Sequence, residues 1–280
     1  MPFDLTPLLE HVPAWLMVMF RLTGIFVLAP VLGSATVPRL VKVMLTLAMS
    51  LAIYPALLDP ARPSAAHMLG FMSDASADGG EGTAGGGLDL WLLVPAIGAE
   101  LLIGFAVGFC ASLPLVGMQM GGHLIEQQMG LGFANILNPE LNASSGAFSQ
   151  FYFLMALVIF IAVGGLEAMY AILLGSFDTI PPGGLAEPGA LLSLVTAMMQ
   201  VMFETAVRVA APLLCLIFAE TLAMGFIART LPQMNILSVG FIIRILAGLV
   251  FTVATLASVA HVFEDVMLEV LRQVTGFFTL

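Results

Sequence analysis

The sequence predicts an all-α, membrane-associated fold of about six long, kinked apolar helices arranged in hairpins. Of the 280 residues, 60% are hydrophobic and only 9% are charged, and the mean hydropathy is +1.07. A soluble domain is about half apolar and about a quarter charged. This chain therefore has too few charged side chains to cover a surface that faces water, and we expect most of its surface to face lipid or other apolar protein.

Six apolar runs are the candidate helices, each near or above the roughly 20 residues that cross a bilayer as a helix. They span residues 14–32, 40–58, 90–118, 148–174, 190–222 and 236–262. The longer runs can tilt or extend beyond the hydrocarbon. Proline interrupts helical hydrogen bonding. We therefore expect kinks within or at the edges of the runs, at Pro30, Pro55, Pro95, Pro114 and Pro212.

Three connections differ in composition from the runs that they join. Residues 59–89 contain an acidic, Gly-rich stretch near 74–87, which predicts a flexible insert that tolerates changes in length. Residues 175–189 are rich in Gly and Pro, a composition that favours turns. Residues 223–235 predict a short polar hairpin between the last two runs.

The few basic residues predict an orientation, because cytoplasmic connections of membrane proteins carry an excess of Lys and Arg. Arg39 and Lys42 flank the first connection and Arg229 marks the fifth, whereas the connections on the other side carry mainly acids. Arg62 and Arg272 do not follow this pattern. The segments predicted to be cytoplasmic are 33–42, 119–147 and 223–235, with both termini on the opposite side.

Charge and motifs disfavour several function classes. The net charge is −10 and the eight basic residues form no cluster, so nucleic acid is not an expected partner, since phosphate binding depends on clustered Lys and Arg. His123 and Glu126 share a helical face, but no further ligands are suitably spaced to complete a metal site. Nucleotide-binding and nucleophile motifs are missing from the sequence. We expect no catalysis, metal or cofactor, and we expect Cys110 and Cys215 to be core residues.

Several charged residues lie within the apolar runs: Arg21, Glu100, Glu167, Glu204, Arg208, Glu220 and Arg244. A charge in hydrocarbon costs at least about 2.5–3.5 kcal/mol, so each should have a partner or water. Glu204 and Arg208 are four residues apart in the order that favours an ion pair on one helix. For the others we favour pairing between helices or between subunits. A proton or ion path is the alternative, although arginines do not titrate.

The segment from Glu126 to Gln150 combines glycines, amides and apolar residues and contains no Lys or Arg. Gly130 and Gly132 allow the backbone to bend, and Asn138-Pro139 favours a turn. Irregular backbone at membrane depth is tolerated only where it is buried in protein or lines a wet cavity. A plain surface loop is one interpretation, and a plug that blocks or lines a passage for something large is the other.

Three stretches resemble the signatures of a known family. They are QQMGLGFANILNP, ARTLPQMNILSVGFIIRILAGL and the N-terminal FRLTGIFVLAPVLGSATVPRLVKVMLTLAMSLAIYP. Together they are similar to the FliR family of flagellar export-gate proteins and its counterparts in injectisome type III secretion. The likeness spans nearly the whole chain, and the Gly-rich insert near 74–87 is the departure from it.

The resemblance implies an architecture. Residues 1–189 would be a FliP-like helical part and residues 190–280 a FliQ-like helical hairpin with a C-terminal tail, and a central plug-like loop would lie near 130–146. The plug and pore closure would involve Met129, Gly130, Leu131, Gly132, Phe133, Asn135, Asn138 and Pro139. The hairpin tip would carry Arg229, Pro232, Gln233 and Asn235.

The resemblance also implies partners and a location. The chain would be a non-catalytic subunit that joins FliP-like and FliQ-like subunits, together with FlhB-like and FlhA-like proteins, and exported flagellar proteins would be its cargo. The assembly would belong to the bacterial inner membrane at the flagellar basal body, with much of it on the periplasmic side. An injectisome export gate is the alternative. A stand-alone secondary transporter is less favoured, because the two halves of the sequence show no convincing repeat.

Overall fold

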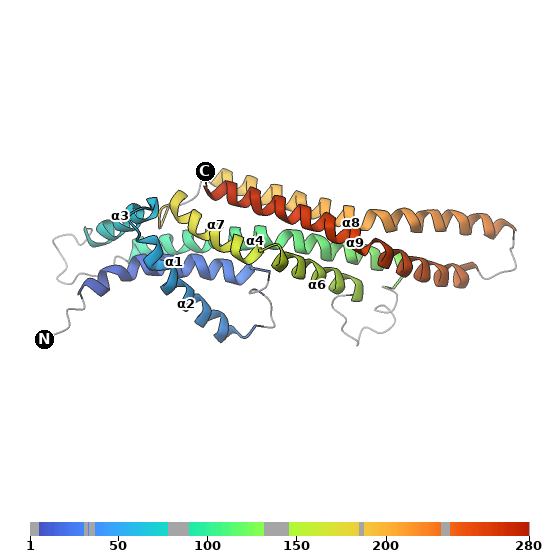
Figure 1. Ribbon diagram of the computed structural model, residues 1–280, viewed down its shortest axis with the longest axis horizontal. Helices are drawn as coiled ribbons and strands as arrows, with labels where there is room; N and C mark the ends of the chain where they lie inside the picture. Colours follow the sequence, from blue (N-terminus) through green and yellow to red (C-terminus); the bar gives the residue numbers. More distant parts are fainter. Residues whose placement is uncertain are drawn as a thin grey trace. The chain divides into compact units, whose positions relative to one another are not determined.

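The computed structural model describes residues 6–30, 33, 37–77, 90–131, 146–184, 188–230 and 236–279. In these ranges every regular element is a helix, which confirms the predicted all-α class (Figure 1). Among the described residues, five helices are long and apolar enough to cross a membrane, or six if α6 and α7 are counted as one broken span. The helices are α1 (Thr6–Leu28), α2 (Arg39–Leu57), α3 (Pro63–Ala77), α4 (Leu90–Met129), α6 (Ala147–Ala162), α7 (Gly165–Thr179), α8 (Pro188–Thr230) and α9 (Ile236–Thr279).

Helix α3 lies within residues 59–89, where the sequence analysis predicts a connection with a flexible insert and does not predict this helix. Pro63 occupies the first position of α3, where its missing N–H is no loss. The next N–H, from Ser64, donates to Asp178 Oδ1 at 3.2 Å. This carboxylate comes from α7, so the signal that starts α3 is not local in sequence. The insert expected near 74–87 begins within α3, and its residues 78–87 lie outside the described ranges.

Three helices extend beyond the apolar runs that predicted them. Residues 119–129, expected in a connection, continue α4, and residues 223–230, expected in a polar hairpin, continue α8. Helix α9 likewise reaches Thr279. Polar side chains alone do not end a helix, whereas Gly and Pro do. Accordingly, α4 ends at Gly130, which has a φ of +80°, and α8 ends shortly before Pro232.

The apolar run 148–174 forms two helices rather than the single one that was predicted. Helix α6 ends at Ala162, and Val163 donates its N–H to Ile159 O at 2.9 Å. Gly164 then adopts a φ of +80°, a conformation that ends helices and that glycine enters without steric cost. A second glycine, Gly165, begins α7. Hydropathy does not detect this break, because apolar residues continue on both sides of the two glycines and Glu167 is the one charged residue of the run.

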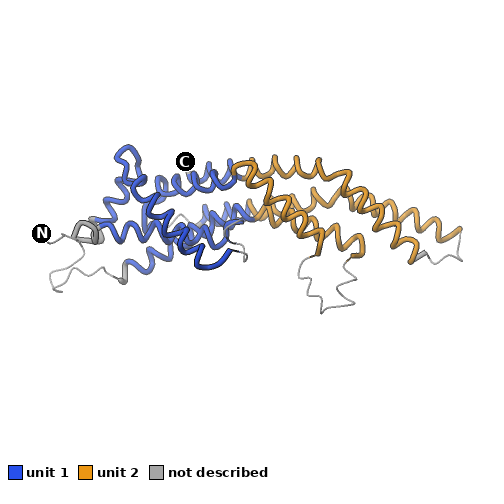
Figure 2. Tube along the Cα trace, turned by 60° about the horizontal axis from the view of Figure 1, so that its bottom comes forward, with its two compact units in different colours: residues 1–112, 165–197, 271–280 blue, residues 113–164, 198–270 orange. Residues whose placement is uncertain are grey.

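The structure divides into two compact units (Figure 2). Unit 1 comprises residues 1–112, 165–197 and 271–280, and unit 2 comprises residues 113–164 and 198–270. Helix α4 contributes to both. This division is based on contacts within the chain. The predicted separation at residue 189 is based on likeness to FliP-like and FliQ-like subunits, and it stays a prediction.

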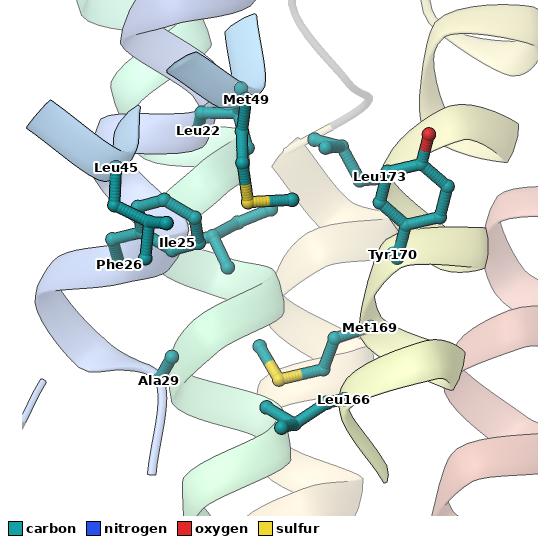
Figure 3. A pocket seen from close by; sticks show the side chains of 10 residues that line it. All are labelled: Leu22, Ile25, Phe26, Ala29, Leu45, Met49, Leu166, Met169, Tyr170 and Leu173. Carbon is teal, nitrogen blue, oxygen red and sulfur yellow. The ribbon is translucent and has the colours of Figure 1, made fainter. Parts of the chain in front are cut away.

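In unit 1, α1 and α4 cross at close range through glycines. A Cβ atom at Gly104 would lie 2.1 Å from the carbonyl oxygen of Arg21, and one at Gly24 would lie 2.6 Å from that of Leu101. Small residues permit such close backbone approach between membrane helices. Beside α1, residues of α2 and α7 complete an apolar cavity of about 260 Å³ (Figure 3).

In unit 2, α4 uses the same device against α8. A Cβ at Gly117 would lie 2.6 Å from the carbonyl oxygen of Met202, and one at Gly121 would lie 3.1 Å from that of Ala206. The adjacent Gly122 faces α6, where a Cβ would lie 2.9 Å from the carbonyl oxygen of Phe148. Packing by glycine therefore brings the C-terminal part of α4 close to both α8 and α6.

Candidate functional site

The central segment leaves α4 through an ordered turn. Gly130 N donates to Gln127 O at 3.1 Å and Leu131 N donates to Glu126 O at 3.2 Å, which satisfies carbonyl groups at the helix end. The preceding Met129 is fully buried. Its side chain occupies the space beside Gly248 of α9, where an added Cβ would lie 2.9 Å from Met129 Cε. The entrance to the segment is thus held by packing in unit 2.

Most of the predicted plug residues lie outside the described ranges: Gly132, Phe133, Asn135, Asn138 and Pro139. The same holds for Pro232, Gln233 and Asn235 at the predicted hairpin tip. Arg229 is described, and it is exposed in the last turn of α8, where a cation is favoured by the helix dipole.

Glu126 is a buried carboxylate at the base of the central segment, with 6% of its surface exposed. It lies against Gly146, where α6 begins, so closely that any side chain at position 146 would overlap the carboxylate. Its Oε2 has no hydrogen-bond partner among the described residues. A negative charge beside a helix N-terminus is favoured by the helix dipole, and no side chain caps α6 by a hydrogen bond. Glu126 therefore connects the end of α4 with the start of α6.

Sequence reasoning considered Glu126 only as a metal ligand beside His123, and so missed this contact. His123 is exposed and its ring nitrogen Nε2 lies 2.9 Å from Gln127 Nε2, whereas Glu126 is buried. No group of three His, Cys, Asp or Glu side chains that could hold a metal occurs in the described part of the chain. The sequence around Gly146, which precedes Ser149 by three residues, gives no indication that the carboxylate of Glu126 lies against it.

Arg21 and Glu100 form a fully buried ion pair in unit 1, where the glycine crossing of α1 and α4 brings them together. Arg21 Nη2 donates to Glu100 Oε1 at 3.0 Å, and Nε donates to Glu100 Oε2 at 2.5 Å. Arg21 Nη1 also donates to Ser176 Oγ at 3.0 Å, and the guanidinium carbon lies 3.8 Å from the centre of the Phe177 ring. Gly183 N donates to Glu100 Oε1 at 2.9 Å. Two-pronged pairing with these additional bonds suits an apolar interior.

The other charged residues of the apolar runs have different environments. Glu204 and Arg208 form the ion pair expected from their spacing on α8, but both are half exposed, at 50% and 56%. Glu220 on α8 accepts from Arg244 on α9 at 3.1 Å, while the Oε1 of Glu220 is buried and has no partner among the described residues. Glu167 is exposed in the first turn of α7, where the helix dipole favours an acid.

The unit 2 parts of α8 and α9 carry much of the exposed apolar surface. Within an apolar 18-residue stretch of each helix, this chain buries only 17% of the residues in α8 and 11% in α9, against 61% in α4. Phe218 and Phe226 on α8 are 67% and 72% exposed. Cys110 is buried as expected, but Cys215 is exposed, because this chain leaves most of the α8 surface uncovered. Apolar area of this extent requires lipid or other proteins as its surroundings.

Comparison with known proteins gives a consistent result. The family of bacterial export proteins, family 1, matches residues 12–270. The flagellar biosynthetic protein FliR of Escherichia coli (strain K12) is 28% identical over 264 residues, which is 92% of this chain and 91% of that protein. FliR of Bacillus subtilis (strain 168) is 24% identical over 92% of each chain.

A relative from a second system covers less of the chain. The secretion system apparatus protein SsaT of Salmonella typhimurium (strain LT2) is 30% identical over 139 residues, which is 49% of this chain and 53% of that protein. The family match covers most of the chain and two FliR proteins align along nearly its whole length. The chain therefore belongs to the bacterial export proteins, family 1, and to the FliR family that its motifs predict.

Proposed function

We propose that the chain is a non-catalytic subunit of a flagellar type III protein-export gate in the bacterial inner membrane. It would help to form the channel through which flagellar proteins cross, and the segment between Gly130 and Gly146 would close that channel at rest. The full-length likeness to two flagellar biosynthetic proteins supports the flagellar assignment. Its proposed partners are FliP-like, FliQ-like, FlhB-like and FlhA-like subunits. Much of the assembly would lie on the periplasmic side.

The observation that carries the gate proposal is the base of the central segment. The segment leaves α4 at Gly130 and enters α6 at Gly146, and Glu126 lies against that second glycine. Its two ends are therefore held at one place in unit 2 by buried contacts. A segment anchored in this way can occupy a passage without loosening the helices beside it, and its apolar residues can exclude water and ions.

The exposed apolar surface of α8 and α9 supports the need for partner subunits. Large uncovered apolar areas mark protein or membrane contacts, and the half-exposed pair Glu204–Arg208 lies among them. Charged groups in such a surface are retained where a partner meets them. We therefore assign this surface to neighbouring subunits of the gate, and assign no proton path to these charges.

The test is Gly130→Val in the full complex, measured by export of flagellar proteins and by ion conductance of cells or of the reconstituted gate. Because Gly130 has a φ of +80°, a β-branched residue there strains the backbone at the exit of α4. We expect altered export or ion leakage while co-purification of partner subunits persists. Gly98→Val is the control, because a side chain at Gly98, on α4 in unit 1 and away from the α8 surface, would meet open space. Loss of assembly with Gly130→Val, or an unchanged gate, would contradict the proposed role.

An injectisome gate is the second candidate, since SsaT is similar to about half of this chain. Complementation distinguishes the two. We expect the chain to restore motility to cells that lack their flagellar FliR protein and not to restore injectisome secretion. Solute transport by the chain alone in vesicles would instead support a secondary transporter.

A further inference from the structure

A groove with a charged end lies between α1 and α2 in unit 1, both drawn in blue in Figure 1. Its volume is about 300 Å³. Phe26 and Val27 of α1 and Leu47 of α2 contribute to its apolar lining, and Arg39 and Lys42 line it at the start of α2. Two polar lining residues, Thr23 and Thr46, direct their hydroxyl groups to carbonyl groups of their own helices. The two cations are therefore the polar groups that the groove offers to a ligand.

Among the residues that the structure describes, no acidic side chain forms an ion pair with these two cations. The sequence contains no acidic residue between Glu10 and Asp59. The structure gives Arg39 and Lys42 no ion pair within the ranges that it describes, whereas three arginines elsewhere each pair with a glutamate. Both cations also lie in the first turn of α2, where the helix dipole disfavours positive charge and no acidic residue is present. An anion from outside the chain would offset all of these unfavourable terms.

The surroundings of the cations are aliphatic rather than polar. Within an apolar 18-residue stretch of α2, this chain buries only 22% of the residues. Exposed aliphatic side chains continue along α2 from the cations: Leu40, Val41, Val43, Met44, Leu47 and Leu51. A ligand that matches both features is anionic at one end and apolar along its length. An acidic protein segment would satisfy the cations but would leave this aliphatic surface without a partner.

We propose that the α1–α2 groove binds one anionic phospholipid, with its phosphate between Arg39 and Lys42 and an acyl chain along Phe26, Val27 and Leu47. Basic residues at the edge of an apolar helix attract anionic headgroups by the same electrostatics. The apolar cavity of Figure 3 shares Phe26 with this groove but has no charged lining residue, so it lacks a counterpart for a headgroup. The site is independent of the proposed export function.

Native mass spectrometry of the delipidated full chain, in detergent and with any subunits that purify with it, tests the proposal. Phosphatidylglycerol, phosphatidylcholine and inorganic phosphate are added separately. We expect one phosphatidylglycerol adduct that survives activation sufficient to remove phosphatidylcholine. The double variant Arg39→Ala, Lys42→Ala should bind phosphatidylglycerol about 30-fold more weakly, since each surface cation contributes about fivefold. Val43→Trp, which fills the groove and keeps both cations, should also lose the adduct.

The matched control is Arg62→Ala with Arg229→Ala, which removes the same charge at positions outside the groove. We expect it to bind like the unaltered chain, and we expect Arg39→Lys with Lys42→Arg to keep binding if the alanine variant does not fold. Equal loss in the Arg62, Arg229 variant would overturn the proposal, and so would an unchanged adduct in Val43→Trp. If inorganic phosphate displaces the lipid as effectively as a second lipid does, the groove binds anions only and the phospholipid proposal is wrong. Exclusion of lipid once partner subunits bind would show that protein covers the groove.

Discussion

The two units treat buried charge in opposite ways. In unit 1, both carboxylate oxygens of Glu100 accept hydrogen bonds, and all three guanidinium nitrogens of Arg21 donate. In unit 2, Glu126 and Glu220 each keep one buried oxygen without a partner among the described residues. An unpaired buried oxygen costs free energy. The difference indicates that unit 1 satisfies its buried ion pair within this chain, although Trp15 Nε1 in the same unit has no hydrogen-bond partner among the described residues. Unit 2 leaves groups that further chain or further subunits can satisfy.

The largest expected effect comes from breaking the Arg21–Glu100 ion pair of unit 1. Arg21→Ala should lower the free energy of unfolding by about 3–5 kcal/mol, because it leaves the buried Glu100 carboxylate without its counter-charge. The fall would be measured by denaturant titration of the purified chain in detergent, followed by circular dichroism. A loss below about 1 kcal/mol would show that water or relaxation replaces the ion pair, and that the unit 1 core is less closed than its hydrogen bonds indicate.

The matched control for this prediction removes both charges. Arg21→Met combined with Glu100→Leu should recover much of the stability, because apolar residues of similar volume often replace a buried ion pair at little cost. If the double variant is as unstable as Arg21→Ala, the loss belongs to packing around Ser176 and Phe177 rather than to the uncompensated charge.

The second prediction compares the glycine crossings of the two units. Gly104→Ala in unit 1 and Gly117→Ala in unit 2 should each cost about 1–3 kcal/mol, since overpacking forces backbones apart. We expect the larger loss at Gly104, where the Cβ would lie 2.1 Å from a carbonyl oxygen, against 2.6 Å at Gly117. Gly98→Ala is the control on α4, where no atom lies within 4 Å of the added Cβ. It should be neutral or stabilising by up to about 1 kcal/mol, because alanine favours helix.

The third prediction sharpens the comparison at Glu126. Gly146→Ala should destabilise the chain by about 1 kcal/mol, because the Glu126 side chain must leave its rotamer to avoid the new methyl group. The backbone at position 146, with a φ of −65°, accepts alanine without strain. Glu126→Ala in the same chain should remove that cost, so a double-mutant cycle should give a coupling near 1 kcal/mol. Additive effects would mean that Glu126 does not rest on Gly146 in solution.

The sequence predicts most of the long helices, but it does not predict the contacts at which helices begin and end. Apolar length predicts α1, α2, α4, α8 and α9, because a span needs a minimum number of apolar residues whatever lies around it. The start of α3 depends on Asp178, more than a hundred residues away, and the division between α6 and α7 depends on the backbone of one glycine in an apolar run. Hydropathy contains neither fact.

The candidate site shows the same limit. Burial cost predicts that Arg21 and Glu100 need partners, but which partner each takes follows from the glycine crossing of α1 and α4. By contrast, the pair Glu204–Arg208 is readable from spacing alone, because one helix fixes both ends. Glu126 was overlooked because its contact, Gly146, has no side chain to suggest an interaction.

The smallest expected effect on stability separates the chain from its assembly. Glu204→Ala should change the free energy of unfolding of the isolated chain by only about 0.3–0.5 kcal/mol, because an exposed pair four residues apart on one helix contributes little. If the α8 surface meets partner subunits, the same variant should reduce co-purification of those subunits and export far more than it reduces stability. Thr196→Ala is the control, an exposed position on α8 whose hydroxyl only donates to its own helix. If both variants have equally small effects on assembly, the α8 surface faces lipid rather than partner subunits. In that case no partner subunit binds Glu204, so its loss does not weaken assembly.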